Sequence, residues 1–392
     1  HNSATSDAIT MASDGTCTAK LTSVGGGGLS HRNIIINGAM TVSQRGTSDS
    51  STNGYGTVDR FGLIRSGVDE NPVQTQHTLT SSDTGPYAEG FRKSFHVQNG
   101  NQTGGVGGND YISMRYRVEA QDMANSGWNY TSSSSFITLS FWVKSSVAQN
   151  FYGYFYSHDG TPQGYSFETG SLTADTWTKV VLKIPGNSNL SFDNNNDSGL
   201  DIYISQFWGI NRTDSGKSLN SWAAYNGAAR MPDFASTWYT TNNATFEITG
   251  VQLEVGDTAT SFEHRSYGEE FSRCQRYFKR MRGAVGGGGG YGSAGDGAVC
   301  TMANWTSTGA YGLLPLGVEM RYAPKLTGFA NLNYFSAGNT FAPNGSSQCY
   351  LAGSSYDRVE LTLQSMTSMA QGNAGWLRID NTNGYMDFDA EI

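Results

Sequence analysis

The sequence is poor in charged residues and in proline, and basic residues are scarcer than acidic ones. Only 15% of its 392 residues are charged, and eight are proline. Long helices draw on Glu, Lys, Leu and Ala, so this composition argues against a mainly helical protein. Lys and Arg number 25 against 33 Asp and Glu, which gives a formal net charge of −8. Because a general nucleic-acid binder needs a basic footprint, we expect no nucleic-acid partner.

Cysteine is scarce and widely spaced. The four cysteines form no CxxC pair and stand at Cys17, Cys274, Cys300 and Cys349. This spacing indicates neither a zinc site nor a disulfide scaffold. We therefore expect free thiols, which is consistent with assembly in a cytoplasm.

Long apolar runs are also missing. No stretch reaches the roughly 18 residues that a membrane helix requires, and no charged-then-apolar secretion signal opens the chain. We therefore expect no membrane insertion. The first residue is His1 rather than Met, from which we expect a fragment whose upstream part is missing.

Recognisable catalytic motifs are absent as well. The chain has no GxSxG elbow and no Cys–His pair, and its six histidines show no metal-ligand spacing. A glycosidase, however, needs only two carboxylates across a cleft. Conceivable members of such a pair are Asp201, Glu247, Glu254 and Glu263, although solvated or turn-capping carboxylates are the simpler interpretation. We expect a protein that is not an enzyme and that has no organic cofactor.

Glycine and aromatic residues are abundant instead. The chain contains 50 Gly, 21 Tyr and 19 Phe. Aromatic and β-branched residues fit pleated sheets, whereas Gly and Asn tolerate turns, so we expect many short strands joined by polar turns. The clearest strand is FITLSFWVKSS at 136–146, where Leu139, Phe141 and Val143 share one face.

Four parts follow one another along the chain. Residues 1–32 resemble a shaft remnant with one hairpin around Asp14-Gly15, followed by a glycine-rich linker. Residues 33–265 give one short strand after another, which predicts an antiparallel jelly-roll sandwich. Residues 266–283 are expected to form a linker helix, and residues 284–392 a second, smaller C-terminal β-sandwich. The predicted fold class is therefore all-β.

The segment 267–282 (YGEEFSRCQRYFKRMR) is the only convincing helix, with acidic residues in its first turn and basic residues in its last. Its apolar residues follow the a/d spacing of a coiled coil, at Phe271, Cys274, Phe278 and Met281. Two interpretations stay open. The helix either packs on its own sandwich or forms a three-helix junction on the symmetry axis of a trimer.

The segment Gly283–Gly297 is dense in glycine and contains GxGxxG-like spacings. Phosphate cradles need a strand before the glycines and a helix after them, and here the order is reversed. We therefore expect no nucleotide site. The segment is either a flexible linker or a binding loop, in which glycine lets the backbone approach a ligand closely.

Two loop-like stretches combine aromatic with polar residues. Sugar binding depends on aromatic faces that stack on a pyranose, flanked by amide and carboxylate groups. The candidate glycan-binding residues are therefore Trp208, Trp222, Tyr225, Trp238 and Tyr239. Packing within the chain or between copies is the alternative for each of them. Trp305 and Trp376, in the last region, could face either the core or the surface.

Three stretches resemble a module that recurs at the ends of bacteriophage tail fibres. NIIINGAMTVSQRGTS followed by YGTVDRF resembles its opening strand and its QRG…DR signature. FITLSFWVKSS with WTKVVLKIPG resembles its middle, and TFEITGVQLEVGDTATSFEHRSYGEEFSRCQRYF its closing strand and exit helix. MRYAP at 320–324 and the terminal FDAEI at 388–392 resemble the last domain that is usual in this family.

The resemblance implies the distal, receptor-binding part of a tailed-bacteriophage tail fibre. It implies a carbohydrate-binding-module-like jelly roll, a homotrimer, and a virion protein that is assembled in the host cytoplasm. The expected function is adsorption to the host cell surface by binding polysaccharide or lipopolysaccharide. The N-terminus is expected to contact other tail proteins. The alternatives are a structural virion connector without host binding and a glycan-degrading tail enzyme.

Jelly-roll modules of this kind often hold a structural calcium ion between their first and last strands. The opening strand NGAMTV lacks the acidic residue that is usual there, so Glu254 in the last strand is the remaining candidate ligand. The enzyme alternative is disfavoured, because capsule-degrading tail proteins usually carry β-helix repeats. No period of about 20 to 30 residues is visible here.

Overall fold

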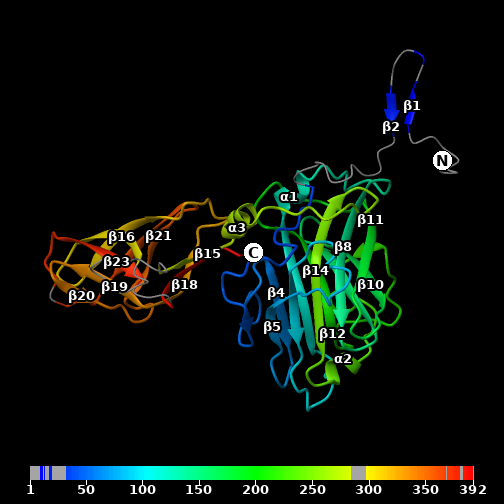
Figure 1. Cartoon of the computed structure of the whole chain (residues 1–392), viewed down its shortest axis with the longest axis horizontal. Helices are drawn as coiled ribbons and strands as arrows, with labels where there is room; N and C mark the ends of the chain where they lie inside the picture. Colours follow the sequence, from blue (N-terminus) through cyan, green and yellow to red (C-terminus); the bar gives the residue numbers. More distant parts are fainter. Residues whose placement is uncertain are drawn as a thin grey trace.

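The structure, a computed structural model, describes residues 9–11, 13, 17–19, 32–283, 297–367, 369–379 and 383–391. In these residues the chain forms two β-sandwiches joined by a short helix, and a small separate hairpin (Figure 1). The predicted all-β fold class is confirmed. No helix in this part of the chain is long and apolar enough to cross a membrane.

Little of residues 1–32 belongs to the described part. The predicted hairpin is present, with β1 (Ile9–Met11) antiparallel to β2 (Cys17–Ala19). The Asp14-Gly15 turn and the glycine-rich segment 284–296 lie outside the described residues. The cysteines whose side chains are described are free thiols, as predicted, at Cys274, Cys300 and Cys349.

The larger sandwich consists of two antiparallel sheets of six strands each, which we call the front and back sheets. The front sheet has the order β13 (Trp222–Ala224), β10 (Gln163–Ser171), β9 (Asn150–Ser157), β12 (Ser198–Trp208), β7 (Tyr111–Glu119), β4 (Phe61–Ser66). The back sheet has the order β11 (Thr178–Pro185), β8 (Phe136–Ser145), β14 (Thr245–Val255), β6 (Lys93–Gln98), β5 (Val73–Thr78), β3 (Ser48–Asp49). Two short helices complete it, α1 (Ala120–Ala124) and α2 (Thr237–Thr240).

Strand alternation places one core between the two sheets. In β8 the side chains of Leu139, Phe141 and Val143 are buried in this core, which confirms the prediction from FITLSFWVKSS. Phe151 and Phe155 of β9 enter the core from the front sheet. Because successive strand residues point to opposite faces, the residues between them belong to the outer surfaces of the sheets.

The exit helix is shorter than predicted. α3 (Tyr267–Gln275) begins after Ser266, whose Oγ accepts a hydrogen bond of 3.3 Å from the amide of Glu269. The chain then continues as strand β15 (Phe278–Arg282), which pairs with β24 (Tyr385–Asp389). The prediction of one helix over 267–282 was therefore wrong at its C-terminal end. Its pairing partner lies far along the chain, so local helix propensity gave no sign of it.

The four apolar residues of the predicted a/d pattern do not form one helical stripe. Phe271 and Cys274 lie on α3 and pack with Ile36 of the same chain. Phe278 and Met281 lie on β15. The helix therefore packs on its own sandwich, and the second sandwich begins at β15 rather than at residue 284. The helical junction no longer supports a trimer, which stays a prediction.

The smaller sandwich pairs a sheet of three strands with one of seven. The three-stranded sheet has the order β15, β24, β18 (Lys325–Ala330). The seven-stranded sheet has the order β20 (Asn339–Phe341), β19 (Leu332–Ser336), β23 (Ala374–Ile379), β16 (Gly297–Asn304), β17 (Ala310–Pro315), β22 (Arg358–Leu363), β21 (Cys349–Ser354). A separate core, rich in Leu and Met, fills the space between them.

A buried network of charges joins the two sandwiches. Arg45 lies 3.0 Å from Asp389 and 3.5 Å from Glu391. The guanidinium of Arg60 is fully buried, forms an ion pair with Glu391, and lies 3.3 Å from the centroid of the Tyr277 ring. The chain end therefore lies at the junction between the sandwiches, beside α3 (Figure 1).

The QRG…DR signature and the terminal FDAEI are thus one structural site. The side-chain amide of Gln44 donates to the carbonyl of Phe278 at 2.7 Å and to Asp59 at 2.5 Å. Burial raises the pKa of Asp59 to about 6, although Arg45 and Gln44 act in the opposite direction. Two motifs that are distant in the sequence contribute opposite charges to one buried contact. Each motif would leave an unpaired buried charge if the other were missing.

Candidate functional site

Two of the predicted glycan-binding residues belong to the core. Trp238 and Tyr239 lie on α2 and are 0% and 1% exposed. The indole Nε1 of Trp238 donates to the carbonyl of Thr245 at 3.0 Å, and Tyr239 stacks on Phe207 with ring centroids 4.4 Å apart. Their assignment to a glycan surface was wrong. A short helix turns both rings into the sandwich, although the sequence around them is polar.

Trp222 takes part in the edge of the same core. It lies on β13, packs against Tyr165 with ring centroids 5.2 Å apart, and donates from Nε1 to the carbonyl of Pro185 at 2.7 Å. The indole N–H of Trp222 therefore has a partner within the chain, and its ring packs, partly buried, against the core. Trp222 lies on an edge strand of the front sheet.

Trp208 and Tyr225 lie on the outer surface of the front sheet, which we call the front face. Trp208 is buried between Tyr111, stacked at 4.3 Å, and the guanidinium of Arg230 at 4.8 Å. Tyr225 is half-buried, and its ring lies 4.3 Å from that of Tyr156. Of the five candidates, only Tyr225 thus combines partial exposure with a place on this face.

The front face is built from rows of side chains that cross β9, β12 and β7. One row consists of Tyr156, Asp201 and Arg117, in direct register. The next row contains Tyr154 and Tyr203, whose rings stack at 4.3 Å with an interplanar angle of 1°. The sequence signal was the alternation in NFYGYFYSHD at 150–159, where every second residue faces outward. This alternation places Tyr156 on the outer side of β9, whereas the aromatic and polar composition of loops does not point to it.

Asp201 forms the polar centre of the front face. Its carboxylate is fully buried, lies 3.2 Å from Arg117 Nε and 2.9 Å from His158 Nε2, and accepts hydrogen bonds from Ser198 and Tyr203 at 2.6 and 3.0 Å. Burial alone would raise the pKa of Asp201, but the hydrogen bonds and the charges of His158 and Arg117 lower it. The carboxylate is therefore ionised at neutral pH and is a poor proton donor.

The other candidate carboxylates each have their own partners. Glu247, on the back sheet, lies 3.0 Å from Lys144 Nζ and 3.1 Å from His77 Nδ1. Burial would raise the pKa of Glu247, but the hydrogen bond with His77 and the charge of Lys144 lower it to about 2. Glu263 accepts a hydrogen bond from the backbone amide of Asn33 at 2.7 Å. None of these contacts joins one candidate to another, and the enzyme alternative stays a prediction.

The surroundings of Glu254 do not fit a calcium ligand. Its Oε1 accepts from the Thr260 amide at 2.8 Å and from Gln252 Nε2 at 2.9 Å, and its Oε2 accepts from Thr260 Oγ1 at 2.6 Å. The guanidinium of Arg32 lies 3.6 Å away, where it would repel a cation. No cluster of three or more His, Cys, Asp or Glu side chains that could hold a metal occurs in the described part of the chain.

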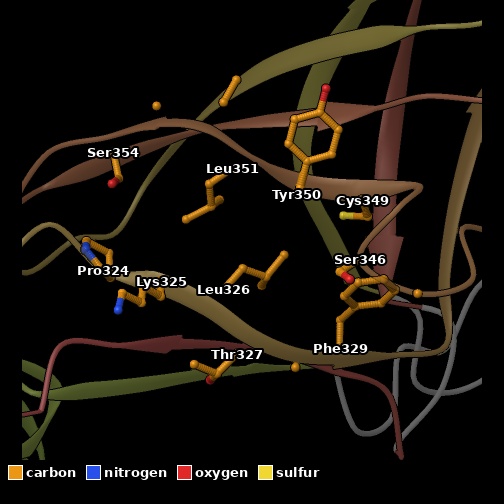
Figure 2. Close-up of a pocket in the computed structure, with 14 residues that line it drawn as sticks. Pro324, Lys325, Leu326, Thr327, Phe329, Ser346, Cys349, Tyr350, Leu351 and Ser354 are labelled. Carbon is orange, nitrogen blue, oxygen red and sulfur yellow. The ribbon is translucent and has the colours of Figure 1, made fainter.

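A cavity of about 700 Å³ lies in the second sandwich. It opens between β18 and β21, which are edge strands of the two sheets. Leu326 and Leu351 point toward each other across it, whereas the ring of Tyr350 points away (Figure 2). Only Lys325 is charged among its lining residues. The cavity is thus a gap between two sheets with a mixed polar and apolar lining, and it lacks the stacked aromatic rings and the charged cluster of the front face.

Comparison with known proteins adds only weak likenesses. No family model matches the chain, and no curated protein matches it. The enzymatically active domain of tailspike protein 4 from bacteriophage CBA120 is 11% identical at a TM-score of 0.30, over 57% of this chain and 21% of that chain. The chain thus spans about a fifth of the length of that tailspike domain.

Two further solved structures are matched over almost their whole length. A putative sugar binding protein from Bacteroides thetaiotaomicron is 11% identical at a TM-score of 0.29, over 57% of this chain and 100% of that chain. The N-terminal cellulose-binding domain of β-1,4-glucanase C from Cellulomonas fimi is 8% identical at a TM-score of 0.26, over 56% of this chain and 99% of that chain. At these TM-scores the fold assignment rests on the strand order described above.

Proposed function

We propose that this chain is the distal part of a phage tail fibre and attaches the virion to its host by binding surface glycan on the front face. The observation that carries this proposal is the row Tyr156–Asp201–Arg117, with Tyr225 beside it. Two half-exposed rings and the partly exposed side chain of Arg117 meet there around the buried Asp201 carboxylate. The sequence resemblance to tail-fibre modules supports the placement in a virion.

The chemistry of the row suits a pyranose. The apolar face of a sugar ring stacks on a Tyr side chain, and its hydroxyl groups hydrogen-bond to ionised and amide groups at the rim. Asp201 is held by four side chains, so the polar groups are already ordered before a ligand arrives. Such preorganisation lowers the entropic cost of binding.

The proposed assembly is a homotrimer whose N-terminal part joins other tail proteins. Three equivalent front faces would act together on a glycan-covered surface. Multivalent attachment of this kind raises the effective affinity by roughly 10² to 10⁴ over a single weak site. Affinity for one glycan chain is therefore expected to be modest, and adsorption strong.

A glycan array probed with the whole chain tests this function. We expect the wild type to bind at least one bacterial surface glycan. We expect the double variant, which combines Tyr156→Ala with Tyr225→Ala, to bind that glycan at least tenfold more weakly. The matched control is Tyr267→Ala, because Tyr267 is 61% exposed on α3, away from the front face. Thermal melting of all three proteins checks that the substitutions leave the fold intact.

Three outcomes would contradict the proposal. An array without any bound glycan, together with tight binding to other tail proteins, would favour the structural connector. Release of reducing ends from a bound polysaccharide would favour the enzyme alternative. Equal loss of binding in the double variant and in the Tyr267 control would remove the front face as the site.

A further inference from the structure

The outer face of the seven-stranded sheet carries a solvent-exposed tryptophan, Trp376. Strand β23 alternates, with Gly375, Leu377 and Ile379 buried and Trp376 and Arg378 on the outer side. The indole of Trp376 is 50% exposed. No described segment covers this indole, so its face is open for stacking with a ligand.

A hollow of about 250 Å³ lies beside this indole. The β19–β20 hairpin forms one wall, with Gly338 at φ +84° in its turn, a conformation that favours glycine. Phe335 lies opposite Trp376 in strand register. The exposed residues Asn339 and Thr340 add amide and hydroxyl groups to the lining. The hollow therefore combines an aromatic platform with hydrogen-bonding groups at the scale of a sugar ring.

Arg378 does not line the hollow itself but lies next to two rings that do, Phe335 and Trp376. Its guanidinium lies 5.0 Å from the Phe335 ring and 5.9 Å from the Trp376 ring. It makes no hydrogen bond or ion pair with any residue that the structure describes, and the residue opposite it on β19 is Asn333. By contrast, Arg280 and Arg358 of the same sandwich each pair with a carboxylate, at 2.6 and 2.9 Å.

We propose that the hollow beside Trp376 binds an anionic pyranose, with the sugar ring on the indole and its carboxylate on the Arg378 guanidinium. A planar guanidinium matches a carboxylate in two parallel hydrogen bonds, and stacking on aromatic rings fixes its orientation. This inference rests on the proposed function, since it names the class of glycan. It places recognition of an acidic sugar on the second sandwich, as a site separate from the front face.

The test compares binding of galacturonic acid oligomers with binding of the same oligomers after reduction of their carboxyl groups. Titration calorimetry on the whole chain, at low and high salt, measures both. We expect the acidic form to bind at least tenfold more tightly at low salt, and Arg378→Ala to abolish this preference. Trp376→Ala is expected to weaken both forms at least tenfold, because it removes the platform.

Matched controls exist on the same domain. Arg358→Ala removes the same charge from β22, three strands away and about 14 Å from β23. Tyr356→Ala removes another aromatic residue that is 45% exposed. Neither is expected to change binding more than twofold. Equal effects of Arg378→Ala and Arg358→Ala, no preference for the acidic form, or no binding of either form would overturn the inference.

The result separates this inference from the proposed function. Array binding that depends on Tyr156 and Tyr225 but not on Trp376 or Arg378 would leave the front face as the glycan site and refute the second one. Binding that depends on Trp376 and Arg378 alone would place all glycan recognition on the second sandwich. The front-face proposal would then fail.

Discussion

The front face of the jelly roll and the outer face of the seven-stranded sheet both carry aromatic residues at alternate strand positions, but among the described residues only the front face is covered by another segment. The segment after β12 folds back over the front face, so that Met231 is completely buried against Tyr154 and Trp208. On the seven-stranded sheet, Trp376 is 50% exposed and Leu313 is 63% exposed. The same alternating pattern therefore leads to buried side chains on one face and to exposed side chains on the other.

The difference shows what decides exposure in a β-sandwich. Alternation determines which side chains leave the core, because each strand has two faces. A connecting segment without strand character determines which of those side chains reach solvent. On the front face that segment covers most of the aromatic rings and leaves Tyr156 and Tyr225 half-exposed at its margin. On the second sandwich no described segment does so, and the residues there are available to a ligand or to another copy.

The sharpest contrast is between a tryptophan in the core and one on the open sheet. We expect Trp238→Ala to destabilise the protein by about 3–5 kcal/mol, because it leaves a cavity in the core. Trp376→Ala is expected to change the free energy of unfolding by less than about 0.5 kcal/mol. Urea unfolding of both variants measures the two values. A small effect of Trp238→Ala would mean that α2 is not part of the cooperative core.

These two residues also mark what the sequence could and could not predict. The strands, the two sandwiches and the FITLSFWVKSS face follow from periodicity, which reads local alternation directly. The direction of Trp238 does not, because a short helix in a polar segment turns it inward. Trp376 alternates in a clear strand, WLRID, yet it is exposed because none of the described segments covers it, which no local pattern encodes. The pairing of β15 with β24 and the Arg60–Glu391 contact are long-range for the same reason.

The two faces keep a fixed relation only while the junction between the sandwiches holds. Glu391→Ala removes the carboxylate that pairs with the buried Arg60. We expect this substitution to lower the free energy of unfolding by about 3 kcal/mol, which is at the lower end of the range for a broken buried ion pair. The loss is limited because Arg60 still donates to the carbonyl of Arg117 at 2.6 Å. Urea unfolding gives the loss, and small-angle scattering shows whether the sandwiches then move relative to each other.

A surface pair supplies the control for this substitution. Asp357 and Arg358 lie 2.9 Å apart with side chains that are 52% and 62% exposed. Asp357→Ala is expected to leave the free energy of unfolding nearly unchanged, because exposed ion pairs contribute little. Equal costs for Glu391→Ala and Asp357→Ala would show that the junction is solvated and that the sandwiches are coupled by other contacts.

The smallest expected difference between the two sandwiches is in how their stability depends on pH. The pKa of Glu247 is lowered from 4.5 to about 2, so its partners stabilise the folded jelly roll above pH 4.5, and this stabilisation is lost as the pH falls toward 2. A shift of this size corresponds to a contribution on the order of 2–3 kcal/mol. The pKa of His77 is raised by its hydrogen bond with Glu247, so its own contribution is complete at low pH and is lost as the pH rises through the raised value.

Residues 284–392 contain no histidine, so the second sandwich has no counterpart to the alkaline part of this response. Hydrogen exchange followed by mass spectrometry reports β14 and β23 separately. We expect protection of β14 to pass through a maximum at mildly acidic pH, and protection of β23 to vary less over the same range. Glu247→Gln should flatten the acid side for β14 alone, since it removes the carboxylate that titrates. A parallel pH response of both strands, in the wild type and the variant, would mean that the two sandwiches unfold as one unit through their junction.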